Sequence, residues 1–263
     1  MADIWFWSHY RDAAGIIRQL VPAPYFSPGK TIVDFGCGDG ATALGIAHSS
    51  EANVIGVDLY RSFEHLPALA AQNLGADPLP GNLAFEQNTL GAPLPLATQS
   101  IDLAYSWSVF EHLADVRGTL SEFARVVRPG GAIFIQIEPL FFGPFGSHMQ
   151  RLIDEPWAHL AHDESEFIAM LQASEDHVPE SERDVLYRTH AFEDLKRHLI
   201  DEYRSLNRIT ADELVRDIAD AGFTIEDERR IRVEGLVPDD RLLTRYPPDL
   251  LLTNQVVVLA TKH

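Results

Sequence analysis

The chain of 263 residues predicts an α/β fold with a doubly wound, mainly parallel sheet of seven strands. Apolar runs with the length of buried strands alternate with segments of helical spacing, which is typical of a parallel sheet covered on both faces. A glycine-rich turn, Gly36-Cys37-Gly38-Asp39-Gly40, joins the first of these runs to the first helical segment. Doubly wound folds place such a turn between their first strand and first helix.

The order of the elements supports this Rossmann-like fold class. We expect the first five strands over 31–35, 53–57, 82–86, 101–105 and 131–137. Helices are expected over 41–49, 62–74 and 116–127. A helix from Thr210 to Ala221, with Glu213 completing a capping box, is followed by two last strands, from Phe223 and over Asn254–Thr261.

Residues 139–209 interrupt the alternation after the fifth strand. They are rich in acidic, histidine and aromatic residues, and their spacing is helical in DESEFIAMLQAS and AFEDLKRHLIDEY. Ligands of doubly wound sheets bind at the carboxyl ends of the strands, and this segment leaves the fifth strand there. We therefore predict a single domain, 1–263, with a helical lid or substrate-binding insertion over 139–209.

Composition limits the setting and the partners. The formal net charge is −18 and the sequence shows no long basic stripe, so we expect neither a nucleic-acid nor an anionic-membrane partner. Cys37 is the single cysteine, which fits a reducing compartment. The N-terminus lacks the pattern of a secretory signal, and no apolar run is long enough to span a bilayer. We expect a cytoplasmic protein.

The glycine spacing and its acidic neighbours predict the kind of ligand. Dinucleotide pyrophosphates are held by G-x-G-x-x-G, whereas this turn reads G-x-G-x-G and continues with Ala41. Asp34 and Asp39 place negative charge beside the turn, which suits a cationic ligand better than a pyrophosphate. Asp58 ends the second strand, where doubly wound sheets hold ribose hydroxyls. A positively charged cofactor that contains a nucleoside fits all of these features.

Several motifs in order resemble the class I S-adenosylmethionine-dependent methyltransferases. The family's first motif, acid-x-G-x-G-x-G, is matched at every defined position by Asp34–Gly40. Further matches in family order are Pro93–Leu96 with Ser100–Ser106, Val109–Leu113, and Phe123–Gly131. The resemblance covers about residues 28–138, with a weaker match at Ala221-Gly222-Phe223. It implies S-adenosyl-L-methionine as cofactor, S-adenosyl-L-homocysteine as product, and methyl transfer to a small-molecule acceptor.

The resemblance also implies a cofactor site. Asp34 and Gly36 would lie near the methionine moiety, Asp58 at the ribose hydroxyls and Leu59 against the adenine. The family places a polar residue, usually Asp, near the adenine amino group, where this chain has Asn88-Thr89. The full expected set is Asp34, Gly36, Cys37, Gly38, Gly40, Asp58, Leu59, Asn88, Thr89, Ser106 and Trp107. Trp107 is equally typical of a core aromatic.

The catalytic residues are less constrained by the sequence. His148 lies in a Pro- and Gly-rich aromatic loop that leaves the fifth strand above the expected methyl donor, so we predict it as the general base for a hydroxyl acceptor. His112, after the fourth strand, is the second candidate. Hydrogen-bonded scaffold is the alternative role of either histidine. Imidazole titrates near pH 6.5 in water, which allows proton removal at neutral pH.

Two further features leave alternatives open. His159 and His162 have the spacing of metal ligands on one helical face, but no matching pair of ligands is evident, and we predict no bound metal. The aromatic N-terminal segment 1–27 is predicted as a helical part of the lid, because helices before the first strand close the site in the family. Covering an exposed face of the sheet is its alternative role.

We expect O-methylation because of the candidate bases. An acidic lid would also attract an amine, so N-methylation stays open, as does C-methylation. A nicotinamide-dependent oxidoreductase and a catalytically silent cofactor-binding protein are the alternatives from other classes. The sequence does not distinguish a monomer from a homodimer.

Overall fold

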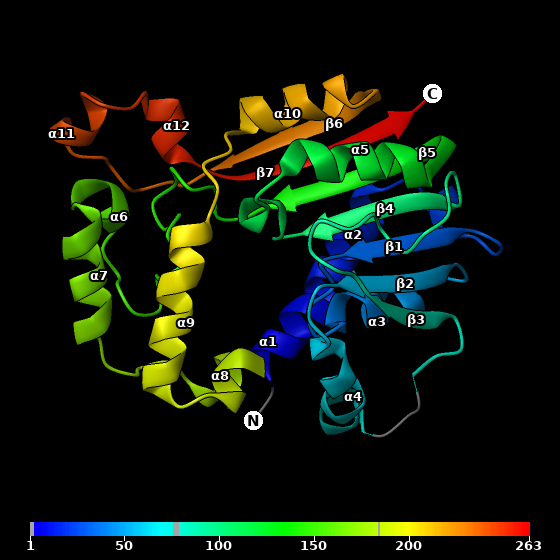
Figure 1. The fold of residues 1–263 in the computed structure, drawn as a ribbon, viewed down its shortest axis with the longest axis horizontal. Helices are drawn as coiled ribbons and strands as arrows, with labels where there is room; N and C mark the ends of the chain where they lie inside the picture. Colours follow the sequence, from blue (N-terminus) through cyan, green and yellow to red (C-terminus); the bar gives the residue numbers. More distant parts are fainter. Residues whose placement is uncertain (1–2, 76–78, 184) are drawn as a thin grey trace.

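The computed structural model describes residues 3–75, 79–183 and 185–263, and these contain a seven-stranded sheet (Figure 1). The strands are β1 (Thr31–Phe35), β2 (Asn53–Asp58), β3 (Leu83–Gln87), β4 (Ile101–Trp107), β5 (Val127–Ile137), β6 (Phe223–Arg232) and β7 (Thr253–Lys262). Their order is β3-β2-β1-β4-β5-β7-β6, with β7 antiparallel to β5 and β6. The predicted doubly wound, mainly parallel α/β fold is confirmed.

The parallel register places several carboxyl ends at one edge of the sheet. Asp34 of β1 pairs with Gly56 of β2 and with Tyr105 of β4. The strands β1, β2 and β4 therefore end side by side, and the loops that follow them meet at this edge. This is the edge at which doubly wound sheets bind ligands.

Helices cover both faces of the sheet (Figure 1). On one face lie α2 (Ala14–Leu20) and α3 (Ala41–His48), and on the other lie α5 (Val116–Val126) and α10 (Ala211–Asp220). Side chains of β1 alternate between the two faces. Ile32 packs in the core under α2 and α3, Val33 packs in the core under α5 and α10, and neither has any exposed surface. Thr210 and Glu213 form the predicted capping box at the start of α10.

Two predicted elements differ from the structure by more than two residues. The fifth strand begins at Val127 rather than at 131, because Gly130 adopts a φ of +76° that lets the strand bend and continue, with an irregular register between Ile101 and Leu103. The helix expected over 62–74 consists of a 3₁₀ turn, Ser62–His65, followed by α4 (Leu66–Leu74).

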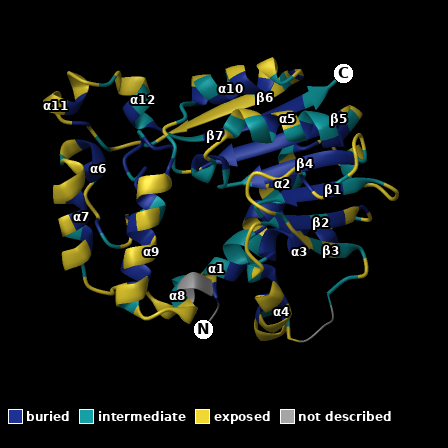
Figure 2. Cartoon of the chain, viewed as in Figure 1, coloured by how far each residue is buried: buried dark blue, intermediate teal, exposed yellow. Residues whose placement is uncertain are grey.

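Residues 139–209 form a group of helices beside the carboxyl ends of the strands (Figure 1). The helices are α6 (Ala158–Ala161), α7 (Glu164–Ala173), α8 (Val185–Thr189) and α9 (Phe192–Ser205). They share a core with α11 (Asp240–Leu243) and α12 (Pro248–Leu252), to which Trp157, Phe167, Leu195 and Leu251 contribute. Figure 2 shows α7 and α9 with exposed outer faces and buried inner faces.

The N-terminal segment is helical as predicted from Ile4 onward. It contains α1 (Ile4–Trp7), a π-helical turn over Ser8–Ala13, α2, and a 3₁₀ turn over Ala23–Phe26. Asp3 forms an ion pair of 2.5 Å with Arg188 of α8, so this segment contacts the helical group of residues 139–209. Residues 1, 2 and 184 of the predicted segments lie outside the described residues. No helix in the described ranges combines the length and the apolar character that a membrane span requires.

Candidate active site

A cavity of about 270 Å³ lies at the carboxyl ends of β1 and β4. Its walls come from the glycine turn, the end of β4 and the N-terminal segment. Five predicted cofactor residues line it: Asp34, Gly36, Cys37, Gly38 and Trp107. Six residues that were not predicted as cofactor ligands also line it: Trp5, His9, Asp39, Thr42, Ser62 and Ser108.

The three glycines of the turn adopt left-handed conformations for different reasons. A Cβ on Gly36 would lie 2.4 Å from the side chain of Val109, and one on Gly40 would lie 2.7 Å from Phe85. These two glycines therefore permit close packing of the turn on its neighbours. Gly38 has no atom within 4 Å of the equivalent position, so its backbone is bare where it faces the cavity. Gly40 itself does not line the cavity.

Asp34 is a buried acid at the cavity wall. Only 2% of its surface is exposed, and burial raises the pKa of its carboxyl to about 7, with nearby Asp58 and Asp39 adding to the rise and Tyr105 opposing it. Neither Oδ2 of Asp34 nor the Tyr105 hydroxyl has a partner in good hydrogen-bond geometry within the described chain. A buried carboxylate without a partner is unfavourable, and a cationic ligand would stabilise it.

Asp58 lies directly beside the glycine turn. Its Oδ2 accepts a hydrogen bond of 2.9 Å from the Gly38 amide, and its Oδ1 accepts one of 2.8 Å from the Tyr60 amide. The carboxylate therefore fixes the turn, although it is not itself part of the cavity wall. The sequence did not show that Asp58 holds the glycine turn through these backbone amides.

The remaining predicted cofactor residues lie around the cavity rather than in its wall. Leu59 follows β2 and is 36% exposed. The Asn88 amide donates a hydrogen bond of 2.8 Å to the Asp58 carbonyl, so Asn88 and Thr89 lie close to the end of β2. Ser106 has no exposed surface, and its Oγ has no partner among the described residues. The structure thus brings Leu59, Asn88 and Thr89 to the expected edge of the sheet, whereas Ser106 is inside the protein.

The N-terminal segment contributes residues that motif reasoning did not assign to the cofactor. Trp5 Nε1 donates a hydrogen bond of 3.1 Å to Oδ2 of Asp39 in the glycine turn. His9 Nδ1 lies 2.9 Å from the Trp5 carbonyl, and the two rings are 4.2 Å apart. The aromatic composition of residues 4–10 was the available signal, because a partly buried indole N–H requires an acceptor.

Ser108 was also missed. It has a φ of +52°, and its amide and hydroxyl donate to Oε1 of Gln136 at 2.9 and 3.0 Å. Gln136 is fully buried in β5, so a polar residue within the apolar run AIFIQI was the signal for an interaction at this position.

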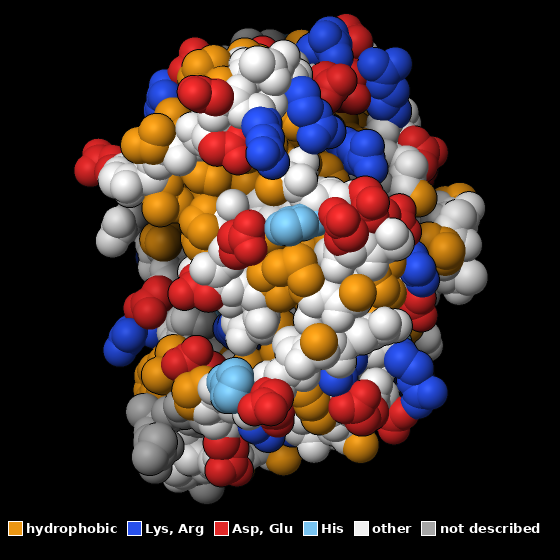
Figure 3. Space-filling view, turned by 90° about the vertical axis from the view of Figure 1, so that its left-hand side faces the viewer, with side chains coloured by type: hydrophobic (Ala, Val, Ile, Leu, Met, Phe, Trp, Pro, Cys, Tyr) orange, Lys and Arg blue, Asp and Glu red, His pale blue; other side chains and the backbone are white. Residues whose placement is uncertain are grey.

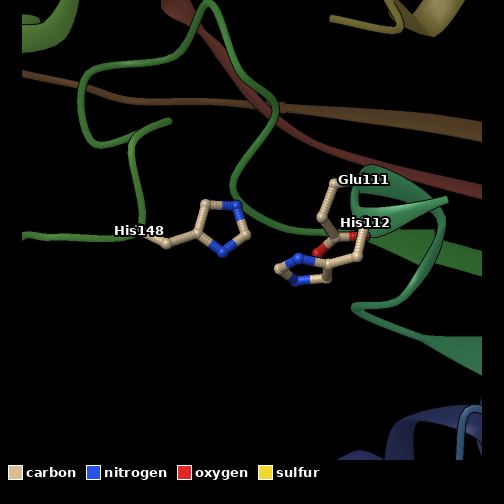
Figure 4. A group of neighbouring side chains, drawn as sticks. All are labelled: Glu111, His112 and His148. Carbon is tan, nitrogen blue, oxygen red and sulfur yellow. The ribbon is translucent and has the colours of Figure 1, made fainter. Parts of the chain in front are cut away.

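A second group of polar side chains includes two that lie close in sequence to Ser108, which is part of the cavity wall. Glu111 and His112 lie in a 3₁₀ turn, Phe110–His112, and His148 lies in the loop after β5 (Figure 4). Glu111, His112 and His148 each offer one ligand atom, and these atoms all lie within 4.8 Å of one another. The structure therefore brings the two predicted catalytic histidines together, with their rings 5.0 Å apart.

Burial changes the proton affinity of all three groups. Burial lowers the pKa of His148 to about 3, with His112 adding to the effect, and lowers the pKa of His112 to about 4. Burial raises the pKa of the Glu111 carboxyl well above its usual range. Both histidines are therefore neutral at pH 7, and our expectation of an imidazole that titrates near its value in water is wrong.

His159 and His162 are not close ligands of one site. His159 is buried, with Nε2 2.6 Å from the Phe141 carbonyl, whereas Nε2 of His162 lies 3.4 Å from Glu155 at the surface. The sequence spacing predicted that both rings lie on one face of a helix. Helix α6 ends at Ala161, so His162 is its C-cap residue and the two rings have different surroundings.

The outer face of the helical group carries charges of both signs. Figure 3 views the side that lies on the left in Figure 1, and acidic, basic and apolar side chains are intermixed over it.

The structure combines a doubly wound sheet with a cavity at the carboxyl ends of its strands. Residues 33–135 match the family model described as a methyltransferase domain. This match covers less than half of the chain, and it makes that region similar to a methyltransferase domain.

Proteins with similar sequences over part of their length are also named methyltransferases. The chain is 38% identical over 120 residues to an O-methyltransferase of Pyrenophora dematioidea, which covers 46% of this chain and 42% of that protein. It is 34% identical over 110 residues to an O-methyltransferase of Aspergillus sclerotiorum, covering 41% and 40%. The matched region is thus less than half of the length of each relative.

A solved structure with a similar fold is the geranyl diphosphate C-methyltransferase of Streptomyces coelicolor, in complex with Mg²⁺, geranyl diphosphate and S-adenosyl-L-homocysteine. It has a TM-score of 0.56 and 13% identity, and the match covers 96% of this chain and 78% of that one. At this identity the likeness shows the fold alone.

Proposed function

We propose that this chain transfers a methyl group from S-adenosyl-L-methionine to a small-molecule acceptor, and that the acceptor atom is oxygen. The observation that carries the proposal is the buried Asp34 carboxylate at the wall of the cavity, beside the bare backbone of Gly38, because Oδ2 of Asp34 has no hydrogen-bond partner among the described residues. A cationic nucleoside cofactor fits this site in charge and in its need for close backbone approach. The relatives named as O-methyltransferases support oxygen as the acceptor atom.

The proposed cofactor contacts come from residues at or after the carboxyl ends of β1, β2, β3 and β4. Asp34, Gly36, Cys37 and Gly38 would hold the methionine moiety, and Asp58 would bind the ribose hydroxyls. Leu59, Asn88 and Thr89 would surround the adenine. Trp107 would close the site from β4, the buried Ser106 would support it from within the protein, and Gly40 would support the turn. When bound, S-adenosyl-L-methionine supplies an electrophilic methyl group on a sulfonium.

The chain's own residues would align the acceptor and accept its proton. His148 and His112 come from two loops at the same edge of the sheet, and both are neutral at pH 7, so each has a lone pair available. We propose His148 as the group that accepts the acceptor's proton, with His112 as its alternative. An amine acceptor would depend less on these residues, because a neutral amine needs no deprotonation before attack.

Two segments would close the site. The bond between Trp5 and Asp39 fastens the N-terminal segment 1–27 to the glycine turn. At the other end of the insertion, Asn207 Nδ2 donates to the carbonyls of Phe110 and Leu113 at 2.6 and 2.9 Å. We propose that segment 1–27 and residues 139–209 together form a lid, which would exclude water from the reacting groups.

Titration calorimetry and a methyl-transfer assay test this function. We expect S-adenosyl-L-methionine and S-adenosyl-L-homocysteine to bind, and NADH not to bind. His148→Ala should lower turnover on phenolic acceptors by about 10²–10⁴-fold with nearly unchanged cofactor affinity. His162→Ala removes a half-buried histidine beside Glu155, outside the cavity and the histidine pair, and should leave turnover unchanged. Binding of NADH instead of S-adenosyl-L-methionine would refute the function, and turnover on amines alone would refute oxygen as the acceptor atom.

A further inference from the structure

We propose that Glu111, His112 and His148 form a binding site for one divalent transition-metal ion. We infer further that this ion binds the acceptor's oxygen at the boundary of the cofactor cavity, and this second step rests on the proposed function. The metal site itself stands on the geometry, burial and charge of the three side chains.

The geometry of the group suits a small ion. The three ligand atoms lie within 4.8 Å of one another, and Figure 4 shows the two imidazole rings and the carboxylate converging from two separate loops. Metal–nitrogen and metal–oxygen bonds of about 2.1 Å at tetrahedral angles place the ligand atoms on one ion about 3.4 Å apart. Binding therefore requires these atoms to approach one another by up to about 1.4 Å, through rotations of the three side chains.

A hydrogen bond of the His148 ring leaves its other ring nitrogen available to a metal ion. Nε2 of His148 lies 3.3 Å from the Pro139 carbonyl, which can only accept, so Nε2 carries the hydrogen. The lone pair of His148 is therefore on Nδ1, where an ion can bind. A backbone carbonyl that fixes the tautomer of a ligating histidine is a common feature of metal sites.

Glu111 supplies the strongest independent argument. It is 2% exposed, and neither of its carboxylate oxygens has a hydrogen-bond partner in the described part of the chain. Two further acids, Glu202 and Glu138, are close enough to raise the pKa of Glu111, and Oε1 of Glu202 lies 3.7 Å from Nδ1 of His112. Acids gathered around a buried, unpartnered carboxylate disfavour its ionised form unless a cation is present. A bound metal ion supplies that cation.

The donor set indicates the class of ion. Two imidazoles and one carboxylate suit Mn²⁺, Fe²⁺, Co²⁺, Ni²⁺ or Zn²⁺, whereas Mg²⁺ and Ca²⁺ prefer sets of oxygen ligands. Three protein ligands also leave coordination positions open, as in catalytic metal sites.

The position of the cluster links it to the cavity. Ser108 lines the cavity, and Val109 packs against Gly36 so closely that a Cβ there would lie 2.4 Å from it. Glu111 and His112 follow two and three residues later, in a turn whose Phe110 carbonyl is held by Asn207. An ion in the cluster therefore lies next to the wall of the cofactor cavity, on the side of the insertion.

The ion would assist the proposed reaction. A hydroxyl bound to a divalent ion loses its proton to water more readily, because the metal stabilises the resulting alkoxide or phenolate. The oxygen then forms a bond to the methyl carbon while the sulfur–carbon bond breaks, and the bonding pair stays on sulfur. With the ion bound, His148 and His112 act as its ligands and not as the general base proposed for the protein without metal, and the proton goes to solvent.

Metal titrations of the full chain, stripped with a chelator, test the site. We expect one Zn²⁺ or Co²⁺ per chain by calorimetry, and a visible Co²⁺ absorption spectrum that depends on the three residues. His148→Asn and Glu111→Gln should each weaken binding by at least about 100-fold, since loss of even an outer-shell partner weakens metal binding by 10–100-fold. His162→Ala, at a surface histidine beside Glu155 and Glu166, is the matched control and should bind metal as the wild type does.

The outcomes separate the two steps. A wild type that binds none of Mn²⁺, Co²⁺ and Zn²⁺, or a His148→Asn variant that retains its thermal stability and binds metal normally, overturns the site. Binding of S-adenosyl-L-homocysteine without any metal binding would support the proposed function and refute the ion. Metal binding that depends on the three residues, with no binding of S-adenosyl-L-homocysteine, would establish the ion and refute the proposed function.

Discussion

Cofactor affinity should depend on pH through Asp34. The free protein holds this carboxyl at a pKa of about 7 because it is buried, so it is mostly protonated below pH 7. The ammonium and sulfonium of S-adenosyl-L-methionine favour the ionised form. The pKa is raised in the free protein and should fall on binding. Affinity should therefore be lost as the pH falls below 7 and reach a plateau above it.

The magnitude follows from the ionised fraction. With a pKa of about 7, Asp34 is ionised in about a tenth of the molecules at pH 6 and in about three quarters at pH 7.5. If the ionised state alone binds tightly, the apparent affinity rises about eightfold over this range. The range ends below the α-amino pKa of about 7.7–8.0, so titration of the ligand's own amine contributes little.

Asp34→Asn provides the perturbation, and calorimetry between pH 6 and 7.5 provides the assay. The variant should bind weakly at every pH and lose the eightfold change. The groups that face Asp34 are Asp58, Asp39, Tyr105 and Cys37. The pKa of the Cys37 thiol is raised beyond the physiological range by burial, and that of Tyr105 is raised as well, so neither titrates here. A variant that retained the full pH dependence would refute the role of Asp34.

Three further predictions concern the glycine turn and its neighbours. Asp58→Ala should weaken binding of S-adenosyl-L-homocysteine by about 2–3 kcal/mol in calorimetry, because charge-assisted hydrogen bonds are lost, and equal affinity would contradict this role. Gly36→Ala should lower the thermal midpoint through strain and a clash, and adding Val109→Ala should restore part of the loss. Trp5→Phe removes the bond to Asp39, so amides of residues 4–13 should exchange faster, and unchanged exchange would show that this bond does not hold the segment.

The fold was predictable because its signals are local. The strand that ends at Phe35, the turn from Gly36 and the helix from Ala41 each follow from a few adjacent residues. The capping box at Thr210 and Glu213 fixes the start of α10 in the same way. The Pro-Gly-Gly segment was harder, because only the pairing of β4 with β5 shows that the strand continues through it.

The residues of the glycine turn were predictable from the sequence. The parts of the candidate site that depend on contacts between distant segments were not. Two functions of the turn, the support of Gly38 by Asp58 and the packing of Gly40 on Phe85, require the tertiary structure. The meeting of His112 with His148 depends on the adjacency of β4 and β5 and on the course of the loop after β5. Glu111 belonged to a recognised motif, but its importance comes from burial without a partner, which no sequence pattern states.

The two buried acids lead to one further step. Asp34 lies at the end of β1 and Glu111 in the turn after β4, and each has a buried carboxylate oxygen without a hydrogen-bond partner among the described residues. An unpartnered buried carboxylate destabilises a fold, and the two proposed ligands would each stabilise one of them. The charge of the bound cofactor would stabilise Asp34, and a metal ion would stabilise Glu111. The two ligands should therefore raise the thermal midpoint independently, and their effects should add when both are present, unless they compete for a single position.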